Sequence, residues 1–406
     1  MKSQEPVADE AEPSPPSLSY AALFARFLRF GFMAFGGPVA QIAMIRRELV
    51  DEERWIGSGR FNRLLAVMQA LPGPEAHELC VHLGIRARGR LGGVLAGLGF
   101  MLPGFLLMLA LAWTYTRLNI DGTALGALFL GVQAAVLAVI LRAVHRIGEH
   151  ILTDSRLWAV ALASAAASLA GVSFWIVLPT AGAAYMLTAA KRYWLLAAVL
   201  ALAGLLAMLT ASDPGIPGVA AAAAAAPGTA TAASLFWTGL KGGLLTFGGA
   251  YTAIPFVRDD SVGRGWMTDA QFLDGLALSG VLPAPLVIFS TFVGWICGGP
   301  AGALAITAGM FLPAFALSLL FYERLEAIAG HRRLQLFLGG VAAGVIGVIA
   351  VTLVDLGRTA INRTPGLLVG LLIFTAALTI LYLWKSKLAT LLVLAIGAAA
   401  GALALR

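Results

Sequence analysis

The sequence is poor in charged residues. Only 12% of its 406 residues are Asp, Glu, Lys or Arg, whereas 59% are hydrophobic. A soluble domain carries about 25% charged residues, so the composition excludes an ordinary soluble protein and predicts a polytopic membrane protein. The net charge of +7 then indicates basic cytoplasmic loops and gives no reason to expect a nucleic-acid partner.

Other absences exclude particular chemistries. The two cysteines, Cys80 and Cys297, lie in apolar runs, where small core residues are expected in place of a disulfide or a metal site. The dipeptide Gly-Lys does not occur, so the chain has no Gly-x-x-x-x-Gly-Lys-Ser/Thr loop for ATP. If the chain is a transporter, we therefore expect an ion gradient or the membrane potential to drive it, and we expect no metal and no cofactor.

The N-terminal segment differs from the rest of the chain. Residues 1–19 are polar, acidic and rich in proline, and they lack the basic start and the cleavage site of a signal peptide. We interpret residues 1–19 as a disordered tail.

Uncharged stretches of about 20 residues predict the membrane helices, because a helix of that length crosses the hydrocarbon core. Two uncharged runs are too long for one helix and must break, residues 157–190 near Gly171 and residues 275–322 at positions 298–300. With these breaks, the chain reads as two sets of about six spans joined by a connecting helix. The other uncharged runs are 91–116, 122–141, 193–212, 334–354, 364–384 and 388–405.

The chain contains an internal repeat. Residues 27–38, which end in Phe-Gly-Gly-Pro, return 212 positions later as residues 239–250, which end in Phe-Gly-Gly-Ala. At offset 211, Leu71-Pro72-Gly73-Pro74 matches Leu282-Pro283-Ala284-Pro285. Glycine and proline stay in register over some eighty residues, which indicates duplication. We predict a first repeat at 20–190, a connecting helix with an Ala/Pro/Gly linker at 191–233, and a second repeat at 234–406.

The distribution of arginine favours an inverted relation between the repeats. Residues 86–90 hold three arginines, whereas the equivalent residues 298–300 hold no charge, and the next pair of loops has the opposite bias. Inverted repeats show this reversal under the positive-inside rule. The five arginines of residues 46–63 do not fit the inverted arrangement, which places this segment on the side of the membrane opposite residues 86–90. We predict an all-α protein with two inverted repeats and helices broken at Gly-Gly and Pro-x-Pro.

Basic residues within apolar segments are the first candidate binding groups. Arg29 and Lys241 each stand six places before a Phe-Gly-Gly, and Arg26 lies three places before Arg29. A cation inside a span usually faces the protein interior or a water-filled pathway. For Arg26, near the helix start, snorkelling to the lipid headgroups is an equal alternative.

The glycine pairs Gly36-Gly37 and Gly248-Gly249 weaken these helices in mid-membrane. A helix that restarts after each pair presents free N–H groups and a positive dipole end. Beside Arg29 or Lys241, such an end suits a small anion. Close helix packing is the alternative reason for the glycines.

Pro72-Gly73-Pro74 and Pro283-Ala284-Pro285 predict discontinuous helices, which are the best sequence pointer to a transporter site. Glu75, His77, Glu78 and His82 follow the first break. Protonatable groups in an apolar run suggest proton coupling, and polar groups that satisfy the helix break are the alternative. A zincin-type metal site does not fit, because the histidines are five residues apart and that motif requires four.

At these residues the chain resembles the chromate ion transporter family in its long, two-domain form. The resemblance covers nearly the whole chain outside the tail and linker. It implies an inner-membrane secondary transporter that exports chromate and confers chromate resistance, with the oxyanion and the bilayer as partners, a homodimer as a further expectation, and no cofactor. It rests on Ala34-Phe35-Gly36-Gly37-Pro38, Gln41, Arg46-Arg47-Glu48, Pro72-Gly73-Pro74, Glu78, His82-Leu83-Gly84, Phe247-Gly248-Gly249, residues 266–272 and Phe311–Pro313.

In this hypothesis Arg29 and Lys241, with Arg26, neutralise the anion, and N–H groups after the two Gly-Gly pairs bind its oxygens. Glu78, with His77, couples protons, and Glu75, His82 and the prolines of both breaks assist coupling or gating.

Two departures from the family pattern leave alternatives open. Glu75-Ala76-His77 stands where the family has Asn-Ser-Thr, and the second Pro-Gly-Pro is Pro283-Ala284-Pro285. A gained carboxylate beside the anion path makes sulfate or another tetrahedral oxyanion an alternative substrate. From other classes, the alternatives are a passive anion channel and an intramembrane enzyme that uses Glu75, His77, Glu78 and His82, although a one-sided active site leaves the duplication unexplained.

Overall fold

The computed structural model describes residues 13–118, 124–212, 230–247, 249–322, 331–384, 386 and 388–405. Within these ranges the chain is helical and has no β-strand. Residues 1–12 of the predicted tail, the linker at 213–229 and Gly248 lie outside the described residues.

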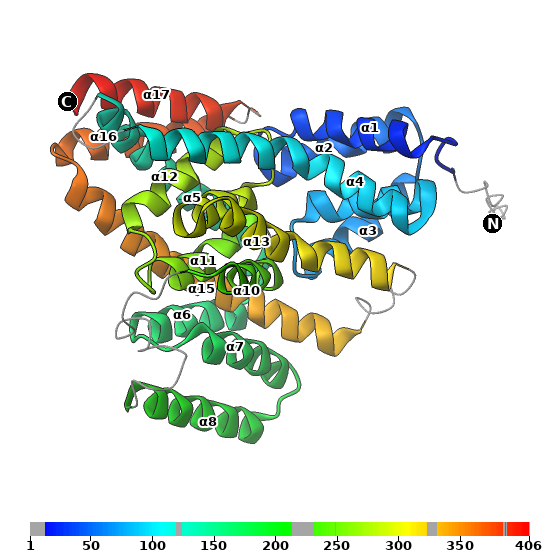
Figure 1. The fold of residues 1–406 in the computed structure, drawn as a ribbon. Helices are drawn as coiled ribbons and strands as arrows, with labels where there is room; N and C mark the ends of the chain where they lie inside the picture. The colour runs from blue at the N-terminus through cyan, green and yellow to red at the C-terminus, as the bar shows by residue number, and fades with distance from the viewer. Residues whose placement is uncertain are drawn as a thin grey trace.

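The α-helices of the two halves follow one another in the same order, whereas the short π- and 3₁₀-helices differ (Figure 1). Helix α8 (Tyr193–Ser212) follows the first half, and this helix covers the uncharged run predicted at 193–212. The first half consists of α1 (Tyr20–Phe32), α2 (Gly37–Arg46), the π-helical η1 (Arg47–Glu52), α3 (Ser58–Ala70), α4 (Glu75–Arg117), α5 (Ala124–Ile151), α6 (Ser155–Leu169) and α7 (Phe174–Ala189). The second consists of α10 (Ala232–Leu244), the 3₁₀-helical η2 (Ala250–Ala253), α11 (Ile254–Ser261), α12 (Asp269–Val281), the 3₁₀-helical η3 (Leu286–Ile288), α13 (Phe289–Phe321), α15 (Arg332–Arg363), α16 (Leu367–Leu383) and α17 (Ala389–Ala404).

The helices end at the breaks that the sequence predicted. Residues 33–36 separate α1 from α2, and residues 71–74 separate α3 from α4. In the second half, α10 ends before Phe247 and α12 ends before Pro283. Gly171, with φ of +78°, lies between α6 and α7. The predicted breaks are therefore confirmed.

Helices α4 and α13 each fold back on themselves at equivalent residues. The backbone has φ/ψ of −147°/31° and 66°/−167° at Arg88 and Gly89, and of −147°/18° and 62°/−155° at Gly298 and Gly299. The second residue of each pair occupies a region that is essentially restricted to glycine. As a result Gly84 approaches the carbonyl of Gly92, although eight residues of straight helix would span about 12 Å. Each of these helices is a tight hairpin, and the duplication extends to backbone angles.

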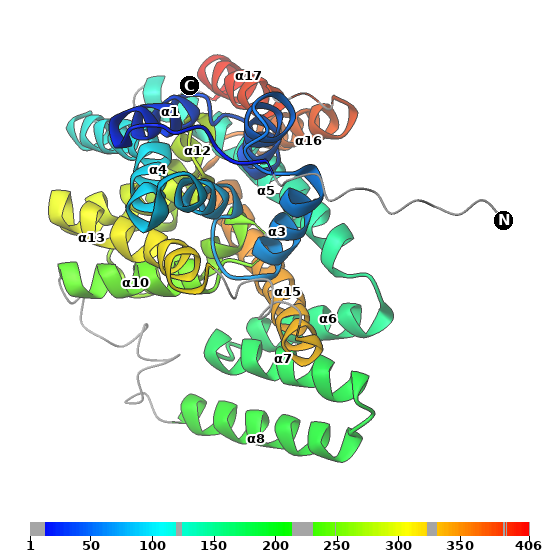
Figure 2. The same cartoon turned by 90° about the vertical axis from the view of Figure 1, so that its right-hand side faces the viewer.

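Helices of each half pack against helices of the other half. Helix α5 packs against α16 and α17 of the second half, and α15 packs against α6 and α7 of the first. Figure 2 shows α15 running beside α6 and α7. Glycines permit close approach at these crossings, because Gly131 meets the backbone of Gly401 and Gly347 meets the backbone of Ala161. The core is thus shared between the repeats.

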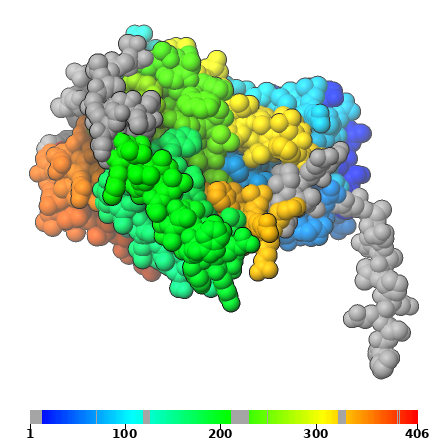
Figure 3. Space-filling model, turned by 90° about the horizontal axis from the view of Figure 1, so that it is seen from below, coloured from blue at the N-terminus to red at the C-terminus, as the bar shows by residue number. Residues whose placement is uncertain are grey.

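Five described segments are long and apolar enough to cross a membrane. They are residues 75–117, 126–151, 193–210, 286–321 and 332–363, and α6, α7, α16 and α17 are shorter apolar helices. Helix α8 lies along the lower face of the molecule (Figure 3). It exposes large apolar side chains such as Trp194 and Met208, which suits a helix in contact with lipid. The protein is an all-α polytopic membrane protein with two repeats. The number of crossings and the inversion stay predictions.

Candidate functional site

Each predicted anion-binding cation forms an ion pair with a carboxylate of its own half. Arg29 on α1 pairs with Glu48 on η1, and Lys241 on α10 pairs with Asp260 on α11. Glu48 and Asp260 are equivalent at offset 212, and each stands 19 residues after its cation. Sequence reasoning named Glu48 only as part of the family motif and did not name Asp260, although this repeated spacing was a signal that could have paired both carboxylates with their cations.

The two pairs differ in burial. The side chains of Arg29 and Glu48 are 53% and 19% exposed, whereas those of Lys241 and Asp260 are 8% and 6% exposed. Attraction between charges is stronger away from water. The second-half pair is therefore the stronger electrostatic contact.

A second cation lies beside each carboxylate. Arg26 Nη2 lies 3.7 Å from Glu48 Oε2, and Arg26 also pairs with Glu53. Arg264 Nη2 lies 3.2 Å from Asp260 Oδ1. The structure thus places Arg26 in the same charged cluster as Arg29, and each half holds one carboxylate between two cations.

A helix starts after each of the two glycine breaks. Helix α2 begins at Gly37, and Gly36 and Gly37 have φ of 86° and 78°. No side chain caps the start of α2. In the second half η2 follows Gly249, and the Phe247 N–H donates to Thr252 Oγ1 over 3.0 Å. The predicted restart after each glycine pair is present, and its proposed role toward an anion stays a prediction.

The two Pro-x-Pro breaks are each bonded to backbone or side chains of the opposite half. The Gly73 N–H donates to the Thr246 carbonyl over 2.8 Å. Gln41 Nε2 donates to the Ala284 carbonyl over 3.0 Å and to the Ala34 carbonyl over 2.8 Å. Ala34 and Thr246 are themselves equivalent at offset 212. Each break therefore contacts the opposite half next to the Phe-Gly-Gly segment of that half.

The protonatable residues after the first break are buried but do not form one cluster. Glu78 lies against Gly73, and neither of its carboxyl oxygens has a hydrogen-bond partner within the described ranges. The His77 ring packs edge-on against Phe311 and Phe315 of α13, at centroid distances of 4.9 and 4.7 Å. Glu75 is also buried. His77 thus contacts the second half directly, and Glu78 lies beside the Gly73 break that is bonded to the second half.

His82 lies further along the same helix, where its ring stacks on Tyr322 at 4.3 Å between centroids. Among the described residues, no three His, Cys, Asp or Glu side chains gather closely enough to hold a metal ion.

A buried acid that sequence reasoning missed lies on α12. Asp274 accepts hydrogen bonds from the Tyr115 hydroxyl of α4, over 2.8 Å, and from Gln133 Nε2 of α5, over 2.6 Å. Asp274 is almost fully buried. Its equivalent in the first half is Arg63, so the repeat gave no signal for it. These three residues form a polar link between the halves.

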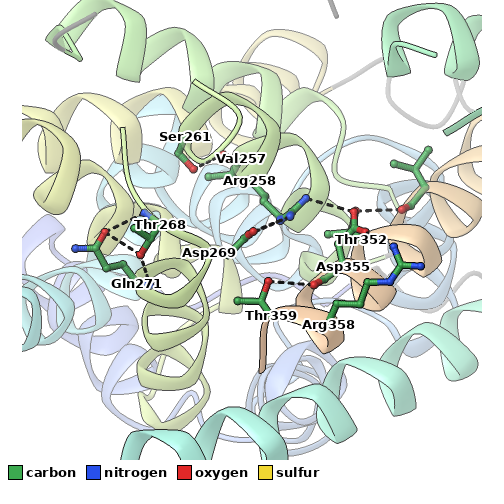
Figure 4. Close-up of polar contacts among 11 residues, drawn as sticks. Val257, Arg258, Ser261, Thr268, Asp269, Gln271, Thr352, Asp355, Arg358 and Thr359 are labelled. Atoms are coloured by element: carbon green, nitrogen blue, oxygen red, sulfur yellow. Dashed lines mark hydrogen bonds and ion pairs between the residues drawn. The ribbon is translucent and has the colours of Figure 1, made fainter. Parts of the chain in front are cut away.

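Arg258 joins three second-half helices (Figure 4). Its Nε and Nη2 donate to Asp269 over 2.6 and 3.0 Å, and its Nη1 lies 3.6 Å from Asp355 Oδ2 on α15. The equivalent Arg46 donates to the neutral oxygens of Ser58 and Asn62, each over 3.0 Å, and its Nε lies 4.0 Å from Asp51 Oδ1. Both arginines anchor the helix that carries the cluster carboxylate.

Duplicated halves, helices broken at the centre and buried charges beside those breaks define a polytopic membrane transporter. The chain belongs to the chromate transporter family, whose model matches residues 21–187 and 233–402. It is therefore a multi-pass protein of the inner membrane and a transporter, and the intramembrane-enzyme alternative is set aside.

Curated relatives match along nearly the whole chain. The chain is 61% identical over 394 residues to a chromate transport protein of Pseudomonas aeruginosa, covering 96% of this chain and 94% of that protein. It is 31% identical to a probable chromate transport protein of Synechococcus elongatus, covering 95% and 96%. It is 29% identical to a chromate transport protein of Cupriavidus metallidurans, covering 88% and 87%. No solved structure matches the chain significantly.

Proposed function

We propose that the protein is a secondary active transporter that exports chromate across the cytoplasmic membrane and so confers chromate resistance. The observation that carries the proposal is the duplicated cation, Arg29 and Lys241, in the helix that ends at each glycine break. Relatives named as chromate transport proteins support the choice of anion. Chromate is a dianion, so a site that binds it requires cationic side chains. The expected homodimer stays a further proposal.

In this mechanism the cations neutralise the anion, and N–H groups after Gly36-Gly37 and Gly248-Gly249 bind its oxygens. Arg26 contributes to the first-half site. The two Pro-x-Pro breaks permit the halves to move against each other, because they lack helical hydrogen bonds and each is hydrogen-bonded to the opposite half. Glu78 exchanges a proton during the cycle, and its burial beside Gly73 couples that proton to the state of the break.

The test is uptake of labelled chromate into everted inner-membrane vesicles, with the proton gradient intact or collapsed. Wild-type protein is expected to take up chromate only with the gradient present. Arg29→Ala and Lys241→Ala are expected to lose uptake, whereas Arg192→Ala, an exposed cation between α7 and α8, serves as the matched control. Normal uptake by inserted Arg29→Ala and Lys241→Ala proteins would refute the anion site.

A second candidate substrate is sulfate or another tetrahedral oxyanion. The observation that favours it is the burial of Glu75 and His77, at positions where this chain departs from the family pattern. Excess sulfate in the same assay separates the two substrates. Weak competition supports chromate, and sulfate flux without chromate flux supports the alternative.

A further inference from the structure

The cation that should bind substrate is already occupied in each half. Glu48 holds Arg29 and Asp260 holds Lys241, at the same spacing and in equivalent helices. A carboxylate and a tetrahedral oxyanion present the same kind of negatively charged oxygen to a cation. An incoming anion therefore meets a site that contains its own competitor.

The neighbouring arginines provide a place for the displaced carboxylate. Asp260 touches Lys241 through Oδ2 and Arg264 through Oδ1. Glu48 likewise lies between Arg29 and Arg26. When the carboxylate leaves the first cation, it keeps the second, so no acid is left unpaired in a poorly solvated site.

A purely structural role does not explain the repetition. An ion pair as exposed as Arg29–Glu48 contributes little to folding. A buried pair can often be replaced by apolar residues without loss of stability. The two pairs share one feature. In each, a carboxylate occupies a cation that lies in the helix ending at a glycine break.

We propose that Asp260, together with Glu48 in the first half, is an internal anion that competes with the transported oxyanion for Lys241 and Arg29. The inference rests on the proposed function. In the substrate-free protein the carboxylate neutralises the site. Substrate displaces Asp260 toward Arg264 and Glu48 toward Arg26, and release of the substrate lets each carboxylate return.

The test compares initial rates of chromate uptake into everted vesicles over a range of chromate concentrations, with each rate divided by the amount of inserted protein. Asp260→Asn is expected to lower the KM for chromate, by roughly tenfold if the pair is closed nine-tenths of the time. Lys241→Met is expected to abolish uptake. The double variant Lys241→Met/Asp260→Asn leaves neither member of the pair charged and is expected to be as inactive as Lys241→Met.

A structural pair would give the opposite pattern, with both single variants impaired and the double variant recovered. Recovery of uptake in the double variant, or an unchanged or raised KM in Asp260→Asn, overturns the proposal. If Asp260→Asn protein fails to insert, Glu48→Gln decides, because its exposed pair tolerates the change. A lowered KM is then expected, and an unchanged KM overturns the proposal.

Glu52→Gln is the matched control, since Glu52 pairs with Arg47 over 2.9 Å on the exposed surface of the same π-helical segment. Its KM should equal that of the wild type, and an equal fall in Glu52→Gln and Glu48→Gln would overturn the proposal. The wild-type arm tests the proposed function separately. Absence of saturable chromate uptake by wild-type protein overturns both ideas, whereas normal wild-type uptake with a failed variant pattern removes only the competition.

Discussion

The two halves share their backbone plan but differ in how they treat charge. The hairpin angles, the helix breaks and the spacing from cation to carboxylate are all repeated. In the second half, however, the ion pair is buried, and Arg258 donates its hydrogen bonds to a carboxylate where Arg46 donates its hydrogen bonds to neutral oxygens. The protonatable Glu78 has no acidic counterpart in the second half, where the equivalent residues are apolar. The two halves have thus kept the same backbone geometry, whereas their charged residues differ in burial and in partners.

The largest expected difference between the halves concerns the stability of the two ion pairs. Asp260→Asn leaves the buried Lys241 without its carboxylate, and breaking a buried pair costs about 3–5 kcal/mol. Glu48→Gln should cost less than about 1 kcal/mol, because solvent screens the exposed pair. Thermal unfolding of the purified proteins in detergent measures both. Equal losses would show that burial does not distinguish the pairs.

The next effect tests whether α1 packs against α4 in the first half as closely as α10 packs against α13 in the second half. A side chain at Gly31 would meet the Phe100 carbonyl at 2.6 Å, and one at Gly243 would meet the Met310 carbonyl. Because backbone atoms cannot move aside easily, valine at either position should destabilise the protein by about 1–3 kcal/mol.

The control for these variants is Gly204→Val on α8, since nothing lies within 4 Å of the added carbon. It should unfold within a few degrees of the wild type. A crossing variant that unfolds like this control would contradict the packing in that half.

A comparison of the two breaks should give a smaller effect. Gly73 has φ of +145°, and an added Cβ would strike Glu78 Oε1, whereas the equivalent Ala284 already carries a Cβ. Gly73→Ala should therefore cost of order 1–2 kcal/mol and slow chromate uptake. Ala284→Gly should retain uptake close to wild type, and equal impairment of both variants would show that the breaks are not distinguished by Gly73.

The smallest expected effect concerns the anchoring arginines. Arg258→Lys loses a two-pronged contact with Asp269 and should cost about 1 kcal/mol. Arg46→Lys replaces contacts to neutral oxygens and should cost roughly half as much. Unfolding of the two variants, compared in one buffer, tests the order, and a larger loss for Arg46→Lys would reverse the comparison.

Much of the fold follows from sequence alone. Low charge and long apolar runs determined a helical membrane protein, because only a helix satisfies its own backbone within lipid. Glycine and proline placed the breaks, because Gly299 adopts angles that other residues avoid and prolines lack the N–H that a helix needs. The repeat and its cations, Arg29 and Lys241, were visible as a fixed offset in the chain.

Only the tertiary structure decided which charges meet and how deeply they are buried. Asp260 reaches Lys241 because the chain turns at Gly249 and α11 packs back on α10, and no local pattern encodes that return. It was equally impossible to predict from sequence that α5 packs against α16 and α17 and that α15 packs against α6 and α7. The four shorter helices are alike in composition, so composition does not select their partners. In a bilayer, helices choose partners by the fit of small residues such as Gly131 and Gly401, and that fit depends on shape in three dimensions.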